Sequence, residues 1–217
     1  LKATKSRRDL GLPKDRLIFL CTFDFFSVIE RKNPLDAIAA FKMAFVENSG
    51  PLLLIKSQNG HLLTEDLALI TQAIEGRTDI VHVDQHVDEE TQASYLQCAD
   101  VLVSLHRSEG LGLHILEALL RGVPVLSTAF SAPTEFLDSA YSALVDYALV
   151  PVKNGNGVYP AGYLWAQPDV QHAAHLMRKL SSNSTYLNDL KKGTVAVQKY
   201  LVSETEAGFK FASWLFE

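Results

Sequence analysis

Short apolar runs alternate along the chain with segments of helical periodicity. Apolar runs of this length fit buried strands, and the segments between them are long enough for amphipathic helices. Strands that alternate with helices are typical of a parallel sheet, because parallel neighbours need a crossover connection. The pattern predicts strands at residues 17–22, 51–56, 79–83, 101–105, 123–127 and 143–146, and helices at 34–46, 65–75, 88–98 and 133–138.

The last third of the chain departs from this alternation. Residues 150–168 hold a turn-rich stretch and then aromatic residues without periodicity, which favours an ordered surface loop or a lid. The expected architecture is a Rossmann-like, doubly wound parallel sheet of about six strands flanked by helices, with further helices at the C-terminus. The sequence predicts C-terminal helices at 170–180, 186–200 and 204–216, a polar linker at 1–16, one domain at 17–200 and a final helical segment at 201–217.

The segment 108–125 carries the most information about function. It places two carboxylates, Glu109 and Glu117, eight positions apart, across a glycine-bearing turn and the first turns of an apolar helix. One predicted strand precedes the segment and another ends it, so the helix is a crossover between parallel strands. Open α/β sheets bind ligands beyond the carboxyl ends of their strands, where this turn lies. Because the helix is apolar on nearly every side, we expect it to be covered and Glu117 to lie partly out of water.

Two interpretations of the glutamate pair follow from its spacing. Over a continuous helix, eight positions span about 12 Å, which exceeds the separation of the two acids in a glycoside hydrolase. That length suits a sugar–diphosphate–ribose ligand over the helix start, with Gly110 and Gly112 allowing the backbone to approach the diphosphate. The alternative is a buried glutamate paired with arginine or lysine, and a second glutamate exposed in the turn. Spacing alone leaves both open.

The residues around the pair resemble a known family. The patterns Ser-Glu-Gly-x-Gly at 108–112 and Glu-Ala-Leu-x-x-Gly-x-Pro-Val at 117–125, with the Glu-x7-Glu spacing, are similar to the retaining family 4 glycosyltransferases. The similar part is their C-terminal, donor-binding domain, which has the GT-B fold. The resemblance extends to the basic stretch at 31–41 and to Ala-Asp-Val at 99–101, and it covers nearly the whole chain. The match of several motifs in order is more specific than Glu-x7-Glu alone.

The resemblance implies a role for each candidate site residue. Glu109, the catalytic candidate, would face the sugar, and Glu117 would accept hydrogen bonds from the ribose hydroxyls. Lys32, together with Arg31, would bind the diphosphate. Most relatives carry an arginine a few positions before the lysine, where Ser27 stands here, so the division of phosphate contacts between the two cations stays open. The set of donor-binding candidates is completed by Lys56, Gly110, Leu111, Gly112 and Leu113.

Several of these polar residues have a second interpretation. Arg31 is also placed to pair with Glu30 or Asp36, and Lys56 at a strand end either contacts the donor or is solvated. His106 is expected to shape the turn before the first glutamate. His114 either packs within the helix or contacts a phosphate.

The activity implied by the resemblance is transfer of a hexose-type sugar from a nucleoside diphosphate donor, with retention at the anomeric carbon, in polysaccharide or glycoconjugate biosynthesis. Acceptor binding in this fold belongs largely to an N-terminal domain that this chain lacks. We therefore expect the chain alone to bind donor weakly and to transfer nothing measurable. The segment 201–217 would pack toward that domain.

The resemblance also bears on cofactors and alternatives. GT-B enzymes typically need no metal, so no cofactor is expected beyond the nucleotide-sugar substrate. Peripheral membrane association of the full-length protein stays open. Two other functions also stay open: a non-catalytic sugar-nucleotide-binding or assembly domain, and a GT-B nucleotide-sugar epimerase.

Composition narrows the class of protein. Of the 217 residues, 47% are hydrophobic and 21% are charged, which is typical of a globular protein with a substantial core. The net charge of −5 argues against general affinity for nucleic acid. Cys21 and Cys98 each end a predicted element, so we expect two reduced thiols and a cytoplasmic location. No pair of histidines has a convincing metal-binding spacing.

Overall fold

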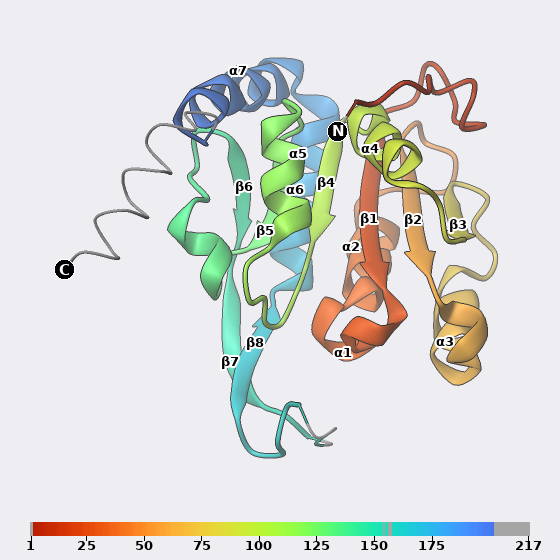
Figure 1. The fold of residues 1–217 in the computed structure, drawn as a ribbon, viewed down its shortest axis with the longest axis vertical. Helices are drawn as coiled ribbons and strands as arrows, with labels where there is room; N and C mark the ends of the chain where they lie inside the picture. The colour runs from red at the N-terminus through yellow and green to blue at the C-terminus, as the bar shows by residue number, and fades with distance from the viewer. Residues whose placement is uncertain (1, 154, 156–157, 202–217) are drawn as a thin grey trace.

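The computed structural model describes residues 2–153, 155 and 158–201, and its centre is one parallel sheet (Figure 1). Six strands lie in the order β3-β2-β1-β4-β5-β6, and every neighbouring pair is parallel. The Rossmann-like, doubly wound fold is therefore confirmed. The strands are β1 (Ile18–Asp24), β2 (Leu52–Gln58), β3 (Ile80–Asp84), β4 (Val101–Ser104), β5 (Val125–Thr128) and β6 (Ser142–Val145).

Helices cover both faces of this sheet (Figure 1). One face is covered by α2 (Pro34–Ala44), α3 (Thr64–Ile74) and α6 (Val170–Ser182). The other face is covered by α4 (Glu89–Cys98) and α5 (Leu113–Leu120), and α7 (Ser184–Leu201) packs against α5 and α6. The predicted helix at 204–216 lies outside the described residues.

The side chains of β1 alternate between two hydrophobic cores. Phe19 and Cys21 belong to the core beneath α2 and α6, whereas Ile18 and Leu20 belong to the core beneath α4 and α5. A strand buried on both faces needs apolar residues at every position, which explains its continuous apolar run. Cys21 is buried and Cys98 is half-buried, and both are free thiols, as predicted.

The carboxyl ends of the strands lie at one edge of the sheet, and the loops that follow them build the candidate site. After β1 the chain forms the 3-10 helix η1 (Phe25–Ser27) and the single turn α1 (Ile29–Lys32). After β2 it forms the 3-10 helix η2 (Gly60–Leu62). The loop after β4 leads into α5 at the same edge (Figure 1).

The structure corrects two predicted elements. The stretch predicted as a loop is bounded by β7 (Tyr147–Pro151) and β8 (Leu164–Pro168), which form an antiparallel hairpin beyond the carboxyl edge of the sheet. The loop prediction was wrong there because the strands are short and the side chains of Tyr147 and Leu149 point to solvent. The helix predicted at 133–138 is only the 3-10 turn η3 (Ala132–Glu135).

The N-terminal segment forms neither helix nor strand, yet it is attached to the domain. The guanidinium of Arg7 bonds the carboxylate of Asp100 at 2.8 Å, and that carboxylate also accepts a hydrogen bond from the Ile18 N–H. Leu10 and Leu12 pack against the core beneath α4 and α5. Within the described part of the chain, none of the helices combines the length and apolar character needed to cross a bilayer.

Candidate functional site

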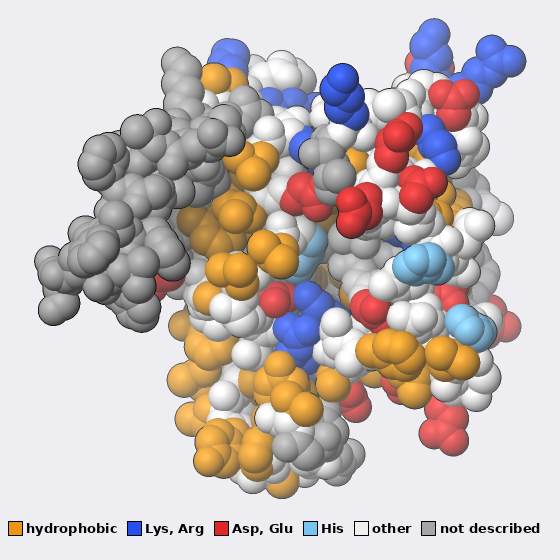
Figure 2. Space-filling model, viewed as in Figure 1, with side chains coloured by type: hydrophobic (Ala, Val, Ile, Leu, Met, Phe, Trp, Pro, Cys, Tyr) orange, Lys and Arg blue, Asp and Glu red, His pale blue; other side chains and the backbone are white. Residues whose placement is uncertain are grey.

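A cleft of about 590 Å³ opens at the carboxyl edge of the sheet, between the ends of β1 and β2, the loop after β3 and the first turns of α5. Figure 2 shows charged and histidine side chains gathered around a hollow in the middle of the face that is turned to the viewer. Four of the predicted site residues line the cleft, namely Lys32, Lys56, Leu113 and Glu117.

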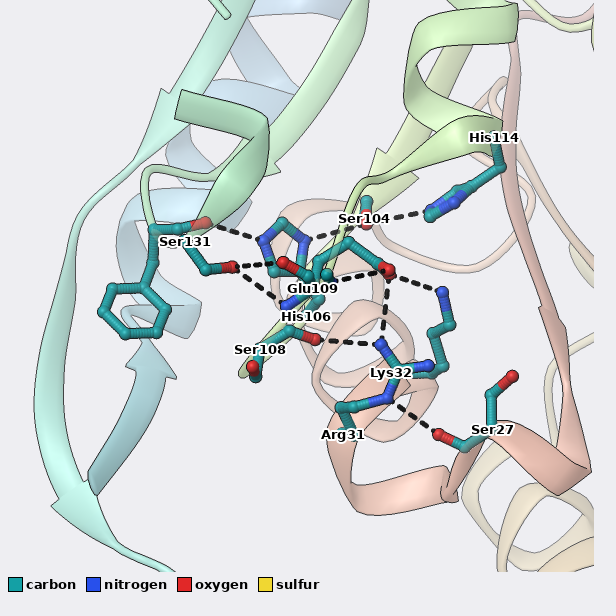
Figure 3. Close-up of polar contacts among 11 residues, drawn as sticks. Ser27, Arg31, Lys32, Ser104, His106, Ser108, Glu109, His114 and Ser131 are labelled. Atoms are coloured by element: carbon teal, nitrogen blue, oxygen red, sulfur yellow. Dashed lines mark hydrogen bonds and ion pairs between the residues drawn. The ribbon is translucent and has the colours of Figure 1, made fainter. Parts of the chain in front are cut away.

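Glu109 lies beside this cleft and is held by both predicted cations (Figure 3). Its Oε2 is 2.5 Å from Lys32 Nζ and 3.3 Å from Arg31 Nη1. Arg31 also donates hydrogen bonds to the carbonyl oxygens of Ser27 and Ser108, at 2.9 and 3.1 Å. Arg31 therefore pairs with Glu109, and the interpretation that pairs it with Glu30 or Asp36 is wrong.

The ion pair shapes the titration of both partners. Burial by itself raises the pKa of Glu109, but the hydrogen bond and charge of Lys32 outweigh it and hold that pKa at about 2. Burial lowers the pKa of Lys32, and Glu109 opposes that effect. The Glu109 side chain is only 10% exposed and that of Lys32 only 12%. A charged pair this deep persists because each charge compensates the other.

The backbone after β1 brings the cations to the glutamate. Asn33 has a left-handed conformation with φ 55° and separates α1 from α2, which begins at Pro34. Its side-chain amide donates a hydrogen bond to the carbonyl oxygen of Leu105 at 2.9 Å, which attaches α1 to the end of β4. Sequence reasoning missed this residue; an asparagine before a proline at a helix start is the available signal.

The start of α5 depends on Gly112. This residue has φ 78°, and a Cβ atom there would lie 3.0 Å from Pro133 Cγ and 3.4 Å from Ile115 Cδ1. Around Gly110, in contrast, a Cβ atom would meet nothing within 4 Å. No described side chain caps the N-terminus of α5, so its first N–H groups are available to an anion.

Glu117 has a more exposed setting than Glu109. Its carboxylate pairs with Arg121 one turn later at 3.0 Å, and its side chain is 34% exposed. The expectation that α5 is covered all round is wrong, because Leu113 is 66% exposed at the cleft and Leu111, just before the helix, is also exposed. On the side of Leu113, the start of α5 faces open space instead of a neighbouring element. Glu117 itself lies partly out of water, as predicted.

Lys56 is a buried cation at the cleft wall. Its ammonium donates hydrogen bonds to the carbonyl oxygens of Ser57 and Gln85, so it joins the end of β2 to the loop after β3. Burial lowers its pKa. The interpretation that Lys56 is a solvated strand end is therefore wrong, and its contact with a ligand stays a prediction.

Ser131 and the histidines support the turn that holds Glu109. Ser131 Oγ accepts a hydrogen bond from the Glu109 N–H at 2.9 Å and donates one to its carbonyl oxygen at 3.1 Å. His106 is fully buried and connects Ser104 to the carbonyl oxygen of Phe130, which fits its expected role in shaping the turn. Among the described residues, no cluster of three or more His, Cys, Asp or Glu is placed to hold a metal ion.

Comparison with known proteins places this chain in a family. The family model "Glycosyl transferases group 1" matches residues 3–195. The fold is similar to sucrose-phosphate synthase from Thermosynechococcus elongatus, with a TM-score of 0.69 and 20% identity over 96% of this chain and 47% of that chain. It is also similar to HepE from Anabaena in complex with UDP and glucose, with a TM-score of 0.69 and 13% identity over 96% of this chain and 50% of that one.

A third solved structure matches over most of both chains. It is the C-terminal domain of the group 1 family protein LpcC from Francisella tularensis, with a TM-score of 0.65 and 16% identity over 91% of this chain and 90% of that chain. Against the two longer proteins, the chain spans about half of their length. A search of the curated proteins found no match.

Proposed function

Since the chain belongs to the group 1 glycosyl transferases, we propose that it is the donor-binding domain of a retaining enzyme that transfers a hexose-type sugar from a nucleoside diphosphate. The observation that carries this proposal is the cleft at the carboxyl edge, which a lysine, a glutamate and the start of α5 all reach. Free N–H groups and a cation suit a diphosphate, and a carboxylate suits the hydroxyls of a ribose. The UDP and glucose held by HepE support a nucleotide-sugar ligand.

The ammonium of Lys32 neutralises the carboxylate of Glu109. A diphosphate in the cleft offers Lys32 a second anionic partner with more charge, so binding would draw the ammonium away from the carboxylate. Glu109, relieved of that partner, would then accept hydrogen bonds from the sugar. Arg31, held by two backbone carbonyls, would keep the turn in place and contribute its charge behind the lysine.

Glu117 and the glycines complete the proposed donor site. Glu117 lines the cleft one turn into α5 and would exchange its pair with Arg121 for the ribose hydroxyls. Gly110 leaves open space in front of the backbone, where the diphosphate would approach. Leu111 and Leu113 would cover the ligand with their exposed side chains. Charge stabilisation on the leaving diphosphate is then the main catalytic contribution of this domain.

The rest of the proposal concerns the whole protein. Residues 17–200 would form the donor-binding domain, and acceptor recognition would come from a second domain, so the 217-residue chain would bind donor weakly without measurable transfer. The segment 201–217 would pack toward that second domain. Catalysis would need no metal, and the reduced thiols favour the cytoplasm.

Calorimetric titration tests donor binding. The chain is titrated with ADP, GDP, UDP and CDP and with the corresponding monophosphates, and one diphosphate is expected to bind more tightly than its monophosphate. Lys32→Ala should weaken that binding about ten- to one-hundred-fold, the value of a charge-assisted hydrogen bond. Lys192→Ala, which removes a 79% exposed lysine on α7, is the matched control and should change nothing. Absence of nucleotide binding, or wild-type affinity in Lys32→Ala, contradicts the proposal.

Product analysis with the full-length protein tests the reaction. A retaining transferase gives a product with the anomeric configuration of the donor, and Glu109→Ala should abolish transfer. A changed sugar in the absence of acceptor would identify an epimerase. Donor binding without any turnover would identify a non-catalytic binding domain. Full transfer by Glu109→Ala would remove the catalytic role of this glutamate.

A further inference from the structure

A chain of hydrogen bonds runs from the end of β5 to the cleft (Figure 3). The carbonyl oxygen of Phe130 lies 3.1 Å from His106 Nε2, and His106 Nδ1 lies 3.0 Å from Ser104 Oγ. Ser104 Oγ in turn lies 3.3 Å from His114 Nε2. Ser104 and His106 are buried, whereas His114, in the first turn of α5, lines the cleft.

The direction of each hydrogen bond follows from the first member, because a carbonyl oxygen only accepts. His106 Nε2 therefore carries a proton. Burial lowers the pKa of His106, so its ring is neutral near pH 7 and its Nδ1 has a lone pair. That nitrogen accepts the hydroxyl proton of Ser104. The Ser104 oxygen can then only accept from His114, so His114 Nε2 carries a proton.

The remaining nitrogen of His114 is consequently an acceptor. Burial lowers the pKa of His114 to about 3, with further lowering from the charges of Lys32 and Arg31 and an opposing contribution from Glu109. The ring is therefore neutral, and Nδ1 has only a lone pair. No described residue donates a hydrogen bond to this atom. A lone pair attracts a hydroxyl proton and repels a phosphate oxygen.

We propose that His114 recognises a hydroxyl group of the bound donor through Nδ1, and that the chain of Phe130, His106 and Ser104 fixes this tautomer. This inference rests on the proposed nucleotide-sugar function for the identity of the ligand. It decides against the interpretation of His114 as a phosphate contact, because its Nε2 proton is donated to Ser104 and its Nδ1 carries no proton. Both the ribose and the transferred sugar carry hydroxyl groups, and the binding experiment below separates these sources.

The tautomer is measured directly in the ligand-free protein. A long-range ¹H–¹⁵N correlation spectrum of histidine-labelled chain at pH 7.5 distinguishes a protonated Nε2 from a protonated Nδ1, and the spectrum of His114→Asn assigns the His114 signals. We expect both His106 and His114 to be neutral with protonated Nε2. A His114 ring that is charged, or protonated at Nδ1, overturns the proposal.

Ser104→Ala tests whether the chain sets the tautomer. Without the hydroxyl, His114 Nε2 loses its acceptor, and the signals should shift toward a mixture of both tautomers. Ser127→Ala is the matched control, because Ser127 is buried and pairs with Ser104 in the register of β4 and β5. The control should leave the His114 signals unchanged. An unchanged tautomer in Ser104→Ala would contradict the positioning role.

Binding variants test recognition of the hydroxyl. The probes are the nucleoside diphosphate selected by titration, its 2′,3′-dideoxy form and its glucose ester. His114→Phe removes the acceptor and should weaken binding about five-fold, the typical value of a neutral hydrogen bond. His114→Asn places an amide oxygen near the former Nδ1 and should restore most of that loss. Weakening confined to the glucose ester assigns the hydroxyl to the sugar, and weakening of the diphosphate but not of its 2′,3′-dideoxy form assigns it to the ribose.

The failures of the two proposals are distinguishable. If His114→Phe binds all three probes as the wild type does, the role of His114 is wrong while the donor site stands. If His114→Phe weakens binding of the 2′,3′-dideoxy diphosphate as much as binding of the parent, His114 contacts a part of the ligand other than a hydroxyl group and the inference is overturned. If the wild type binds no probe, the proposed function fails and the ligand role of His114 fails with it.

Discussion

The two glutamates of the site stand in contrasting surroundings. Glu109 lies in the turn before α5, is 10% exposed and shares its carboxylate between Lys32 and Arg31. Glu117 lies within α5, is 34% exposed and pairs with Arg121 on the same helix. The difference indicates that Glu109 contributes to the fold, whereas Glu117 could exchange its partner for a ligand at small structural cost. Two glutamates of the same motif therefore need not have the same role.

The largest expected effect lies between the two glutamates, at the glycines. Gly112→Ala should lower the free energy of unfolding by about 2 to 3 kcal/mol, because the residue has a positive φ and a Cβ atom would press on Pro133. Gly110→Ala, where the added methyl group has open space, is the matched control, with an expected change below about 0.5 kcal/mol. Urea unfolding measures both. If both variants lose the same unfolding free energy, the positive φ of Gly112 is not what fixes the start of α5.

The next effect separates the glutamates themselves. Glu109→Gln should lower the free energy of unfolding by about 1 to 2 kcal/mol, because it leaves two largely buried cations without their carboxylate. The same substitution at Glu117 provides the comparison. If urea unfolding shows a larger loss of unfolding free energy for Glu117→Gln than for Glu109→Gln, Glu117 and not Glu109 is the glutamate that supports the fold.

A pH titration of stability sharpens this result. The pKa of Glu109 is lowered to about 2 in the folded state, so its carboxylate stabilises the protein above its ordinary pKa of 4.5 and loses that contribution as the pH falls toward 2. The difference in unfolding free energy between wild type and Glu109→Gln should therefore shrink by about 1 kcal/mol between pH 5 and pH 3. Urea unfolding at each pH measures it. A difference that stays constant over this range would show that the charge of Glu109 is not the source.

The smallest expected effect belongs to Glu117. Its pair with Arg121 is an i,i+4 contact at a partly exposed position, so Glu117→Gln should change the free energy of unfolding by less than about 0.5 kcal/mol. The same variant should weaken nucleotide binding, which calorimetry measures. A loss of stability without a loss of binding would assign Glu117 to the structure alone.

The sheet and its helices are predictable from the sequence because burial on both faces demands continuous apolar runs. β1 shows this clearly, since Phe19 and Ile18 point to opposite cores. The hairpin of β7 and β8 is not predictable in this way. Its strands pair with each other and not with the main sheet, and Tyr147 and Leu149 face solvent, so hydrophobic periodicity is lost.

Four of the predicted residues line the cleft, whereas the pairings among the charged residues of the site are not predictable from the sequence. Lys32 and Glu109 are 77 positions apart, and their contact depends on the left-handed Asn33 that turns α1 toward β4. Apolar spacing also predicts a covered α5, because composition cannot show that the first turn of the helix faces an opening. The chain of Ser104, His106 and His114 needs the sheet edge to bring its members together.

The strand order has one more consequence. β1 and β4 are neighbours, yet the chain leaving β1 runs to the face that holds α2, and the chain leaving β4 runs to the face that holds α5. The connections that follow β1 and β4 therefore lie on opposite faces of the sheet. The crevice between them results from this topology and not from the residues that line it. Substitution of the residues that line this crevice would therefore change which molecule binds there, while the crevice itself would persist.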